Sequence, residues 1–266
     1  MGKRIAILLA ALLIAAAATA QVYHPGESLQ YRVSYRAKLF PNTEVATVTI
    51  DTSRQTENGE EVYKVVGNGK TMSVFRWFFS LDDTYTLTID PQTLRTNRFE
   101  SDIREGSYTF RSEYIYDWQN LEVRTRWQSR QNPQKTKTMK ITEKGMDPVS
   151  LYFNLRSVDT DAMRQGDSQS LEMVLEDTIR TLDFRFLGRE IRKIPKRGKF
   201  RTLKFACQIG TSDGFSFTDG TEFTVWISDD RNKIPLYIES PIRVGSIQAY
   251  ISSFSGLKYP LDCRSD

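Results

Sequence analysis

The stretch that decides the fold is YTFRSEYIYDWQNLEVRTRW, residues 108–127. Aromatic residues occupy four of the even-numbered positions from Tyr108 to Tyr116, and polar residues occupy most positions between them. From Leu121 to Trp127 the less polar residues stand at every second position again. Period-two alternation is typical of a strand with one buried face and one exposed face. Because residues 117–120 suit a turn, the stretch predicts an antiparallel hairpin.

The same alternation recurs along most of the chain. It is found in residues 31–36, 84–90, 182–186, 223–227 and 247–251. Turn signals separate such segments. Both residues of Asn58-Gly59 tolerate positive φ and predict a hairpin turn, Glu105-Gly106 is a further hairpin candidate, and Asp219-Gly220 stands just before a strand pattern. This succession predicts an all-β fold, built as a large curved antiparallel sheet or a partly closed β-barrel.

One segment has the features of a helix. Asp147 offers a side-chain acceptor directly before Pro148, a residue that suits the first helical position. A short apolar face follows, formed by Val149, Tyr152, Phe153 and Leu155. We predict one short helix near residues 148–157 that plugs or flanks the sheet. The polar loop 159–168 is the best position for a domain boundary, but the composition does not change there, and we expect a single β-rich domain over residues 21–266.

The N-terminus has the pattern of an export signal. Lys3 and Arg4 precede an uncharged apolar run, residues 5–17, and Ala18-Thr19-Ala20 forms a small-x-small cleavage site. We therefore expect a signal peptide over residues 1–20, cleavage between Ala20 and Gln21, and a periplasmic or secreted product. No later apolar stretch approaches the roughly 20 residues that a membrane-spanning helix needs. The mature protein is thus not expected to be an integral helical membrane protein.

Charge and cysteine content restrict the partners. The chain carries a formal net charge of +4, and removal of Lys3 and Arg4 leaves 35 basic and 33 acidic residues, a net charge of +2. This near balance does not favour a nucleic-acid partner. Cys207 and Cys263 could form a disulfide in an oxidising compartment, or remain as a buried strand thiol and a tail thiol. The sequence leaves both open, as it does the oligomeric state.

Three stretches carry a resemblance to a known family. They are GESLQYRVSY at 26–35, DPVSLYFNLR at 147–156, and WISDDRNKIPLYI at 226–238, with VGSI at 244–247 close behind. In their order and spacing the chain resembles a family of exported bacterial proteins known as domain of unknown function 3108. The late hairpin, with Trp226 and Pro235, is the most distinctive part. The resemblance implies an all-β periplasmic protein of unknown biochemistry, and it transfers no catalytic residue.

Few groups suit catalysis or metal binding. His24 is the only histidine, and a flexible residue near the new N-terminus is a simpler interpretation than a triad member. Cys207 has apolar neighbours, which favours a buried thiol. Asp213, Asp219 and Glu222 could offer oxygen ligands to calcium, although Asp and Gly also simply make turns. We predict no catalytic residue, no metal and no cofactor.

Two segments suggest binding surfaces. Residues 74–81 form the strongest apolar cluster, interpreted as a strand or short helix packed in the core, or as an aromatic lip of a lipid pocket. Residues 189–201 hold seven basic residues and one acid, interpreted as a solvated hairpin or as a site for anionic head groups. The candidate ligand-lining residues are Phe75, Trp77, Phe78 and Trp226. The candidate anion-binding residues are Arg192, Lys193, Lys196 and Arg197.

These observations favour a non-enzymatic protein of the cell envelope that binds an apolar or amphipathic ligand, such as a lipid, or another envelope component. A sheet with one dry face must close on itself or on something else, and large barrels leave room for a ligand. One alternative is an outer-membrane barrel, against which the helix, the basic segment and the polar C-terminus argue. The other is a carbohydrate-active enzyme, which needs two carboxylates about 5 to 10 Å apart.

Overall fold

The described part of the chain forms one continuous sheet. The computed structural model describes residues 24–37, 40–77, 79–209, 222–242 and 245–265. The predicted signal peptide, Phe78, Asp213 and Asp219 lie outside these residues. Within the described ranges, sixteen strands join in the order β8-β7-β6-β5-β4-β3-β2-β1-β15-β14-β13-β12-β11-β10-β9, with β16 paired to β12. Every pairing is antiparallel except that of β9 with β10.

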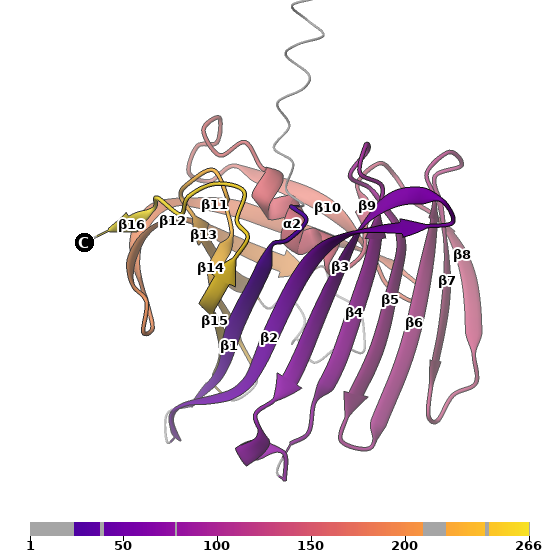
Figure 1. The fold of residues 1–266 in the computed structure, drawn as a ribbon, viewed down its shortest axis with the longest axis horizontal. Coiled ribbons are helices and arrows are strands. Elements are labelled where there is room, and N and C mark those ends of the chain that lie inside the picture. Colours follow the sequence, from indigo (N-terminus) through magenta and orange to yellow (C-terminus); the bar gives the residue numbers. More distant parts are fainter. Residues whose placement is uncertain (1–23, 38–39, 78, 210–221, 243–244, 266) are drawn as a thin grey trace, which may run out of the picture.

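The first half is a meander that runs outward from the first strand (Figure 1). Its strands are β1 (Ser28–Ala37), β2 (Phe40–Glu57), β3 (Glu60–Thr71), β4 (Asp82–Ile89), β5 (Thr96–Glu105), β6 (Tyr108–Asp117), β7 (Glu122–Ser129) and β8 (Lys135–Lys140). The turn predicted at Asn58-Gly59 is confirmed, since both residues have positive φ and join the paired Glu57 and Glu60. The hairpin predicted over residues 108–127 is confirmed as β6 and β7.

The second half runs back inward and rejoins the first strand. After β9 (Gly145–Met146) and α2 (Ser150–Ser157), its strands are β10 (Ser168–Val174), β11 (Ile179–Ile194), β12 (Gly198–Ile209), β13 (Glu222–Ser228), β14 (Pro235–Pro241), β15 (Ser246–Ser255) and β16 (Arg264–Ser265). β15 pairs with β1 at the middle of the sheet. The all-β prediction with one short helix is thereby confirmed. No helix among the described residues is long and apolar enough to cross a bilayer.

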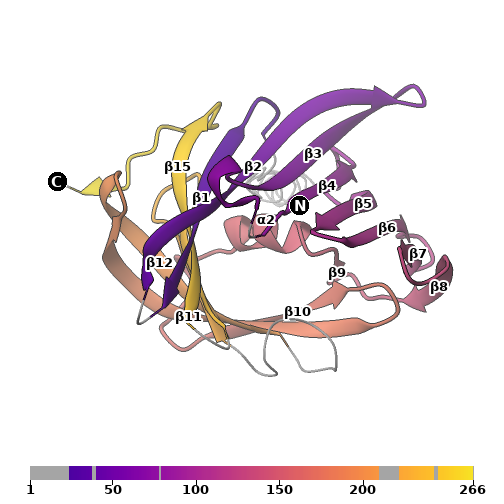
Figure 2. The same ribbon diagram turned by 90° about the horizontal axis from the view of Figure 1, so that it is seen from below.

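The sheet curves until its two ends approach each other (Figure 2). The ladder stays open between β8 and β9, and side chains connect the ends instead. The β10–β11 turn places Glu176 against the opposite arm, where it accepts hydrogen bonds from the hydroxyls of Tyr114, at 3.3 Å, and Thr125. Lys137 on β8 donates to the carbonyl of Asp177 at 2.6 Å. We call this contact the clasp, and it makes the sheet a partly closed barrel.

Helix α2 lies on the concave side of the sheet, where the apolar side chains gather (Figure 2). Phe153 joins a cluster with buried residues of β3 to β7, and Leu155 joins a cluster with β10 to β13. Tyr152 packs against the first cluster and against another formed largely by β1, β14 and β15. The protein's own side chains therefore fill the concave face around the helix.

The helix begins two residues later than predicted, but its cap is the expected one. The Asp147 carboxylate accepts backbone N–H bonds from Val149 and Ser150, both at 2.9 Å. It also accepts hydroxyl hydrogen bonds from Thr96, at 3.0 Å, and from Ser150. Pro148 and Val149 form the turn that leads into the helix, and Val149 already has helical dihedrals, with φ −85° and ψ −36°.

The aromatic segment at 74–81 is not a core element, contrary to the first interpretation of it. It forms a short 3-10 turn, η2 (Ser73–Phe75), and an irregular link between β3 and β4. Val74, Trp77 and Phe79 are exposed to solvent. The segment connects two adjacent antiparallel strands at their ends, and the side chains of Val74, Trp77 and Phe79 meet solvent rather than the apolar clusters.

Candidate functional site

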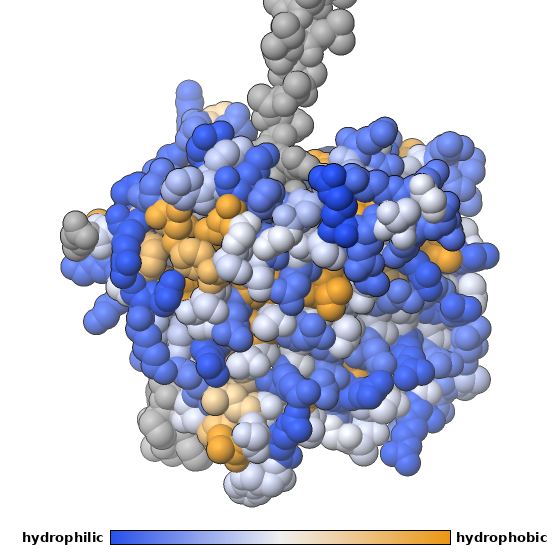
Figure 3. Space-filling model, in the orientation of Figure 1, coloured by the Kyte–Doolittle hydropathy of each residue, from blue (hydrophilic) through white to orange (hydrophobic). Residues whose placement is uncertain are grey.

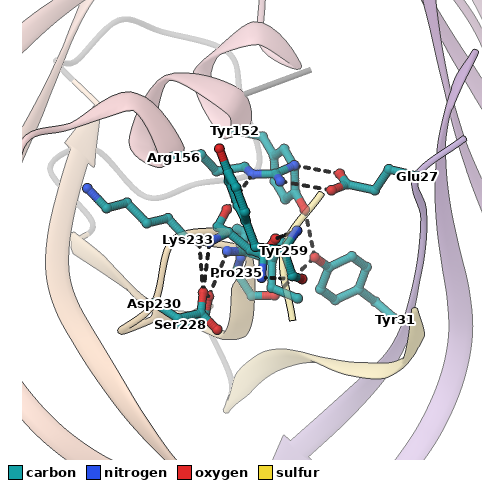
Figure 4. A network of polar contacts seen from close by, with 11 residues as sticks. Glu27, Tyr31, Tyr152, Arg156, Ser228, Asp230, Lys233, Pro235 and Tyr259 are labelled. Atoms are coloured by element: carbon teal, nitrogen blue, oxygen red, sulfur yellow. Dashed lines mark hydrogen bonds and ion pairs between the residues drawn. The ribbon is translucent and has the colours of Figure 1, made fainter. Parts of the chain in front are cut away.

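The three stretches quoted above, far apart in sequence, meet in one buried polar network (Figure 4). Glu27 directly precedes β1 and Tyr31 lies on it, and Tyr152 and Arg156 come from successive turns of α2. The link between β13 and β14, residues 229–234, supplies the third side. The network joins the first strand, the helix and the late hairpin.

An ion pair lies at its centre. Arg156 Nη1 and Nη2 donate to the two carboxylate oxygens of Glu27 at 2.6 and 2.9 Å, and Nε donates to the carbonyl of Asn232 at 3.1 Å. Both side chains are almost fully buried. Burial alone would lower the pKa of Arg156, but its hydrogen bonds and charge interaction with Glu27 outweigh burial and raise it. The pair is a fixed bidentate bridge.

Two tyrosines extend the network. The Tyr31 hydroxyl lies 3.0 Å from the Pro235 carbonyl and 2.7 Å from the Tyr152 hydroxyl. Because a carbonyl can only accept, Tyr31 donates its proton to Pro235 and Tyr152 donates to Tyr31. Burial raises the pKa of both phenols well above the usual range. Both therefore stay protonated and act as fixed hydrogen-bond donors.

The β13–β14 link is organised by its own polar residues. Asp230 accepts from the Ser228 hydroxyl and from the amides of Asn232 and Lys233. The Asn232 side chain binds the carbonyls of Tyr259 and Pro260 in the C-terminal segment. Lys233 Nζ donates to the carbonyl of Val158, just past the end of α2, at 2.6 Å. This link is the turn that the sequence predicted, and it ties the C-terminal segment to the helix.

The titratable side chains of this network contact one another or the backbone. Arg156 and Glu27 are paired, and burial raises the pKa of both phenols. Burial lowers the pKa of Lys233, whose Nζ donates to the carbonyl of Val158. No set of three His, Cys, Asp or Glu side chains in the described ranges suits a metal ion. The arrangement holds the first strand, the helix and the late hairpin together.

The sequence did not reveal the buried pair in advance. Glu27 and Arg156 are 129 positions apart, and nothing local couples them. The available signal was Arg156 on a helix otherwise lined by apolar and aromatic residues, four positions after Tyr152, since a charge on a buried face needs a partner.

A charged groove of about 490 Å³ lies over strands β4 to β7. Its acids are paired with arginines. Glu113 contacts Arg98 and Arg126 at 2.5 and 2.6 Å, and Asp102 contacts Arg104 at 2.8 Å. The hydrogen bond from Arg104 lowers the pKa of Asp102. An acid catalyst of glycoside cleavage needs the opposite shift, so Asp102 lacks that property.

The predicted ligand-lining residues do not form one surface. Trp77 is the most exposed, at 84%, and Phe75, partly buried, precedes it in the same connection. Trp226 is only 4% exposed and packs edge-on against Tyr237 on β14. Its indole N–H donates to Glu190 at 2.5 Å. Trp226 is thus covered by the protein itself.

The predicted anion-binding residues lie on the β11–β12 hairpin, whose solvated turn around Pro195 and Gly198 is observed. Arg192 stacks over the rings of Trp226 and Tyr237 at 4.2 and 4.3 Å, so it meets one of the predicted ligand-lining residues. Lys196 pairs with Glu44 at 2.6 Å. Arg197 lies over the ring of Phe254, and Lys193 is exposed. Three of the four are therefore engaged within the protein.

The two cysteines are free thiols in different clusters. Cys207 lies with β10 to β13, and Cys263 lies with β1, β14 and β15. Burial raises the pKa of Cys207 to about 12 and raises that of Cys263 as well, with a further contribution from Asp230. The disulfide that the sequence left open is absent.

A family model described as a protein of unknown function, DUF3108, matches residues 30–252. The chain belongs to the DUF3108 family. The match covers Tyr31, helix α2 and the late hairpin of the buried network, and Glu27 lies just before its first residue. No curated protein matches the chain.

Two solved structures resemble this DUF3108 chain. One is the β-barrel-like DUF1849 protein of Brucella abortus, at 10% identity and a TM-score of 0.54 over 88% of this chain and 98% of that one. The other is a candidate lipoprotein from Parabacteroides distasonis, at 10% identity and a TM-score of 0.39 over 89% and 99%. At such low identity, the first likeness shows the fold alone.

Proposed function

We propose that this DUF3108 protein is exported, acts in the cell envelope without catalysing a reaction, and binds an amphipathic envelope component at its surface. The observation that carries the proposal is the exposed segment between β3 and β4. Val74, Trp77 and Phe79 are 63%, 84% and 48% exposed, in a protein that otherwise buries most of its large apolar side chains. An exposed apolar patch on a soluble surface often marks an interaction site.

The filled interior supports a surface role. Helix α2 and the three apolar clusters around it occupy the concave face. Among the described residues, the protein's own side chains therefore fill the core. The ion-paired groove over β4 to β7 supports the non-enzymatic part, since its carboxylates are matched with arginines. Its charges also favour a sheet that faces water there. The export signal read from the sequence supports the location.

In-cell photo-crosslinking tests the proposal. p-Benzoylphenylalanine would replace Trp77 in one strain and Ile191, 61% exposed on the β11–β12 hairpin, in a matched control. We expect adducts with a lipid or an envelope protein from position 77 and none from position 191. Fractionation should place the processed chain in the periplasmic extract. A lack of adducts at position 77, or a cytoplasmic chain that keeps its first twenty residues, would contradict the proposal.

A further inference from the structure

The segment between β3 and β4 is built on a rigid base. Thr71 and Leu81 exchange hydrogen bonds at its foot, where the Leu81 amide donates to the Thr71 hydroxyl at 2.9 Å and the Thr71 amide donates to the Leu81 carbonyl at 3.0 Å. The amide of Gly106 in the β5–β6 turn donates to the carbonyl of Ser80 at 2.7 Å. We call Val74, Trp77 and Phe79 together the apolar tip. Its side chains are exposed although its ends are fixed.

Several polar groups of the segment are hydrogen-bonded inside the turn. The indole N–H of Trp77 donates to the carbonyl of Val74 at 3.0 Å. The amides of Phe75 and Phe79 donate to the carbonyls of Met72 and Phe75 at 2.9 and 3.0 Å. Dehydrating a polar group is costly unless it is hydrogen-bonded. Because these bonds are already made, the tip can leave water without losing them.

The tip projects from one end of the sheet rather than lining a groove. In Figure 1, η2 lies at the lower end of the molecule, and the face shown in Figure 3 is largely hydrophilic with several separate apolar areas. Tyr108, which begins β6 after the neighbouring turn, is also 48% exposed. A protein partner of ordinary size covers about 800 Å² on each side, far more than a three-residue tip supplies.

The chemistry of the tip suits a bilayer surface. Tryptophan and tyrosine are enriched at the boundary between lipid tails and water, because their rings are apolar with one polar atom. Arg76, in the middle of the segment, is exposed and basic, and residues 73–79 include no acid. A cation beside an apolar insertion is favourable at an anionic lipid surface.

We infer that the amphipathic component is the surface of a phospholipid bilayer, into which the apolar tip inserts. This inference rests on the proposed surface-binding function and names its partner. The strands that carry the ion-paired groove stay in water. Insertion is shallow and reversible, because a few side chains bury only a small apolar area.

Flotation with vesicles of phosphatidylethanolamine and phosphatidylglycerol tests the inference on the purified protein. We expect the wild-type protein to float with vesicles. The double variant Val74→Ser/Trp77→Ser should partition into vesicles at least about tenfold more weakly than the wild type. Ile191→Ser should float like the wild type. Trp77→Phe, which keeps an aromatic ring, should retain most binding but lose the part of the fluorescence quenching by brominated lipid that Trp77 contributes. Equal thermal midpoints would show that each variant is folded.

Two results would overturn the bilayer inference. One is a wild-type protein that stays with the aqueous fraction, and the other is a tip variant that floats as well as the wild type. If position 77 still forms adducts with an envelope protein in cells, the surface-binding function stands and the partner is a protein instead. If neither adducts nor flotation are found, both proposals fail.

Discussion

Arg156 shows how a buried charge is held in this protein. Its three donor nitrogens meet the Glu27 carboxylate and the Asn232 carbonyl, so the charge is paired and hydrogen-bonded. A buried ion pair adds little stability over a well-packed apolar pair, because dehydrating both charges is costly. The loss of one partner is different, since it leaves the other charge buried and unpaired. The pair therefore specifies how α2 docks on β1 more than it strengthens the fold.

The first prediction compares the loss of one partner of the buried ion pair with the loss of both partners. Arg156→Met should lower the free energy of unfolding by about 3–5 kcal/mol, because Glu27 is left unpaired in the core. The double variant Glu27→Met/Arg156→Met should recover much of that loss, since no buried charge remains. Urea unfolding followed by circular dichroism measures both values.

The matched control is the exposed ion pair between Arg54 on β2 and Glu61 on β3. Arg54 Nη1 lies 3.0 Å from Glu61 Oε2. Arg54→Met should change stability by about 1 kcal/mol or less, as solvent screens exposed pairs. A loss for Arg156→Met no larger than that for Arg54→Met would refute the central role of the buried pair.

At the scale of elements, strands and turns could be predicted because their signals are local. Alternation within residues 108–127 and the pair Asn58-Gly59 each fix a nearby conformation. The burial of residues 74–81 could not be predicted in this way. An aromatic run looks the same whether it enters a core or projects from it, and only the sheet order places it at an end. For the same reason, nothing local showed that Arg192 would cover Trp226.

The second prediction compares two glycines that both have positive φ. Gly256, after β15, has a φ of 63°, and a Cβ there would collide with the carbonyl group of Gly26. Gly59, in the β2–β3 turn, has a φ of 86° and open space around the same position. Gly59→Ala should destabilise by about 1–2 kcal/mol through backbone strain alone.

Gly256→Ala should cost about 1–3 kcal/mol more than Gly59→Ala, because the obstacle is backbone and cannot rotate away. This contact lies just beyond the end of the β1–β15 ladder, where Ser28 pairs with Ser255. Thermal unfolding of both variants gives the comparison. Equal losses would mean that the backbone at this end of the ladder has room to shift, and that strain rather than contact sets the effect.

At the scale of the whole molecule, we expect acids in buried or half-buried positions to set the pH dependence of stability. Glu176 in the clasp and Asp147 at the cap of α2 both have raised pKa values, mainly because burial disfavours their charged forms. Asp83 and Glu105 shift in the same direction for the same reason. Only one histidine is present in the chain, so carboxyl groups should dominate any change in stability from mildly acidic to neutral pH.

The third prediction follows from the sign of these shifts. An acid with a raised pKa in the folded state binds its proton more tightly there than in the unfolded chain, where the value is about 4. Its stabilising effect is complete below that value and is lost as the pH rises through the folded pKa. The pKa values of three other acids are lowered, namely those of Asp102, Asp117 and Glu44. Their contribution to the free energy of unfolding is lost only when the pH falls below about 4. The urea midpoint should therefore be higher near about pH 5 than near about pH 7.5.

Variants that replace one acid with its neutral amide show which acids cause the pH dependence of stability. Glu176→Gln and Asp147→Asn keep an oxygen acceptor for the hydroxyl of Tyr114 and for the amides of α2 respectively, and remove a buried ionisation. Each should reduce the difference between the two midpoints, whereas Glu61→Gln, on the exposed pair, should leave it unchanged. A wild-type midpoint that rises from about pH 5 to about pH 7.5 would show that paired carboxylates dominate instead. The clasp would then have to close with Glu176 charged, which its burial between two arms of the sheet opposes.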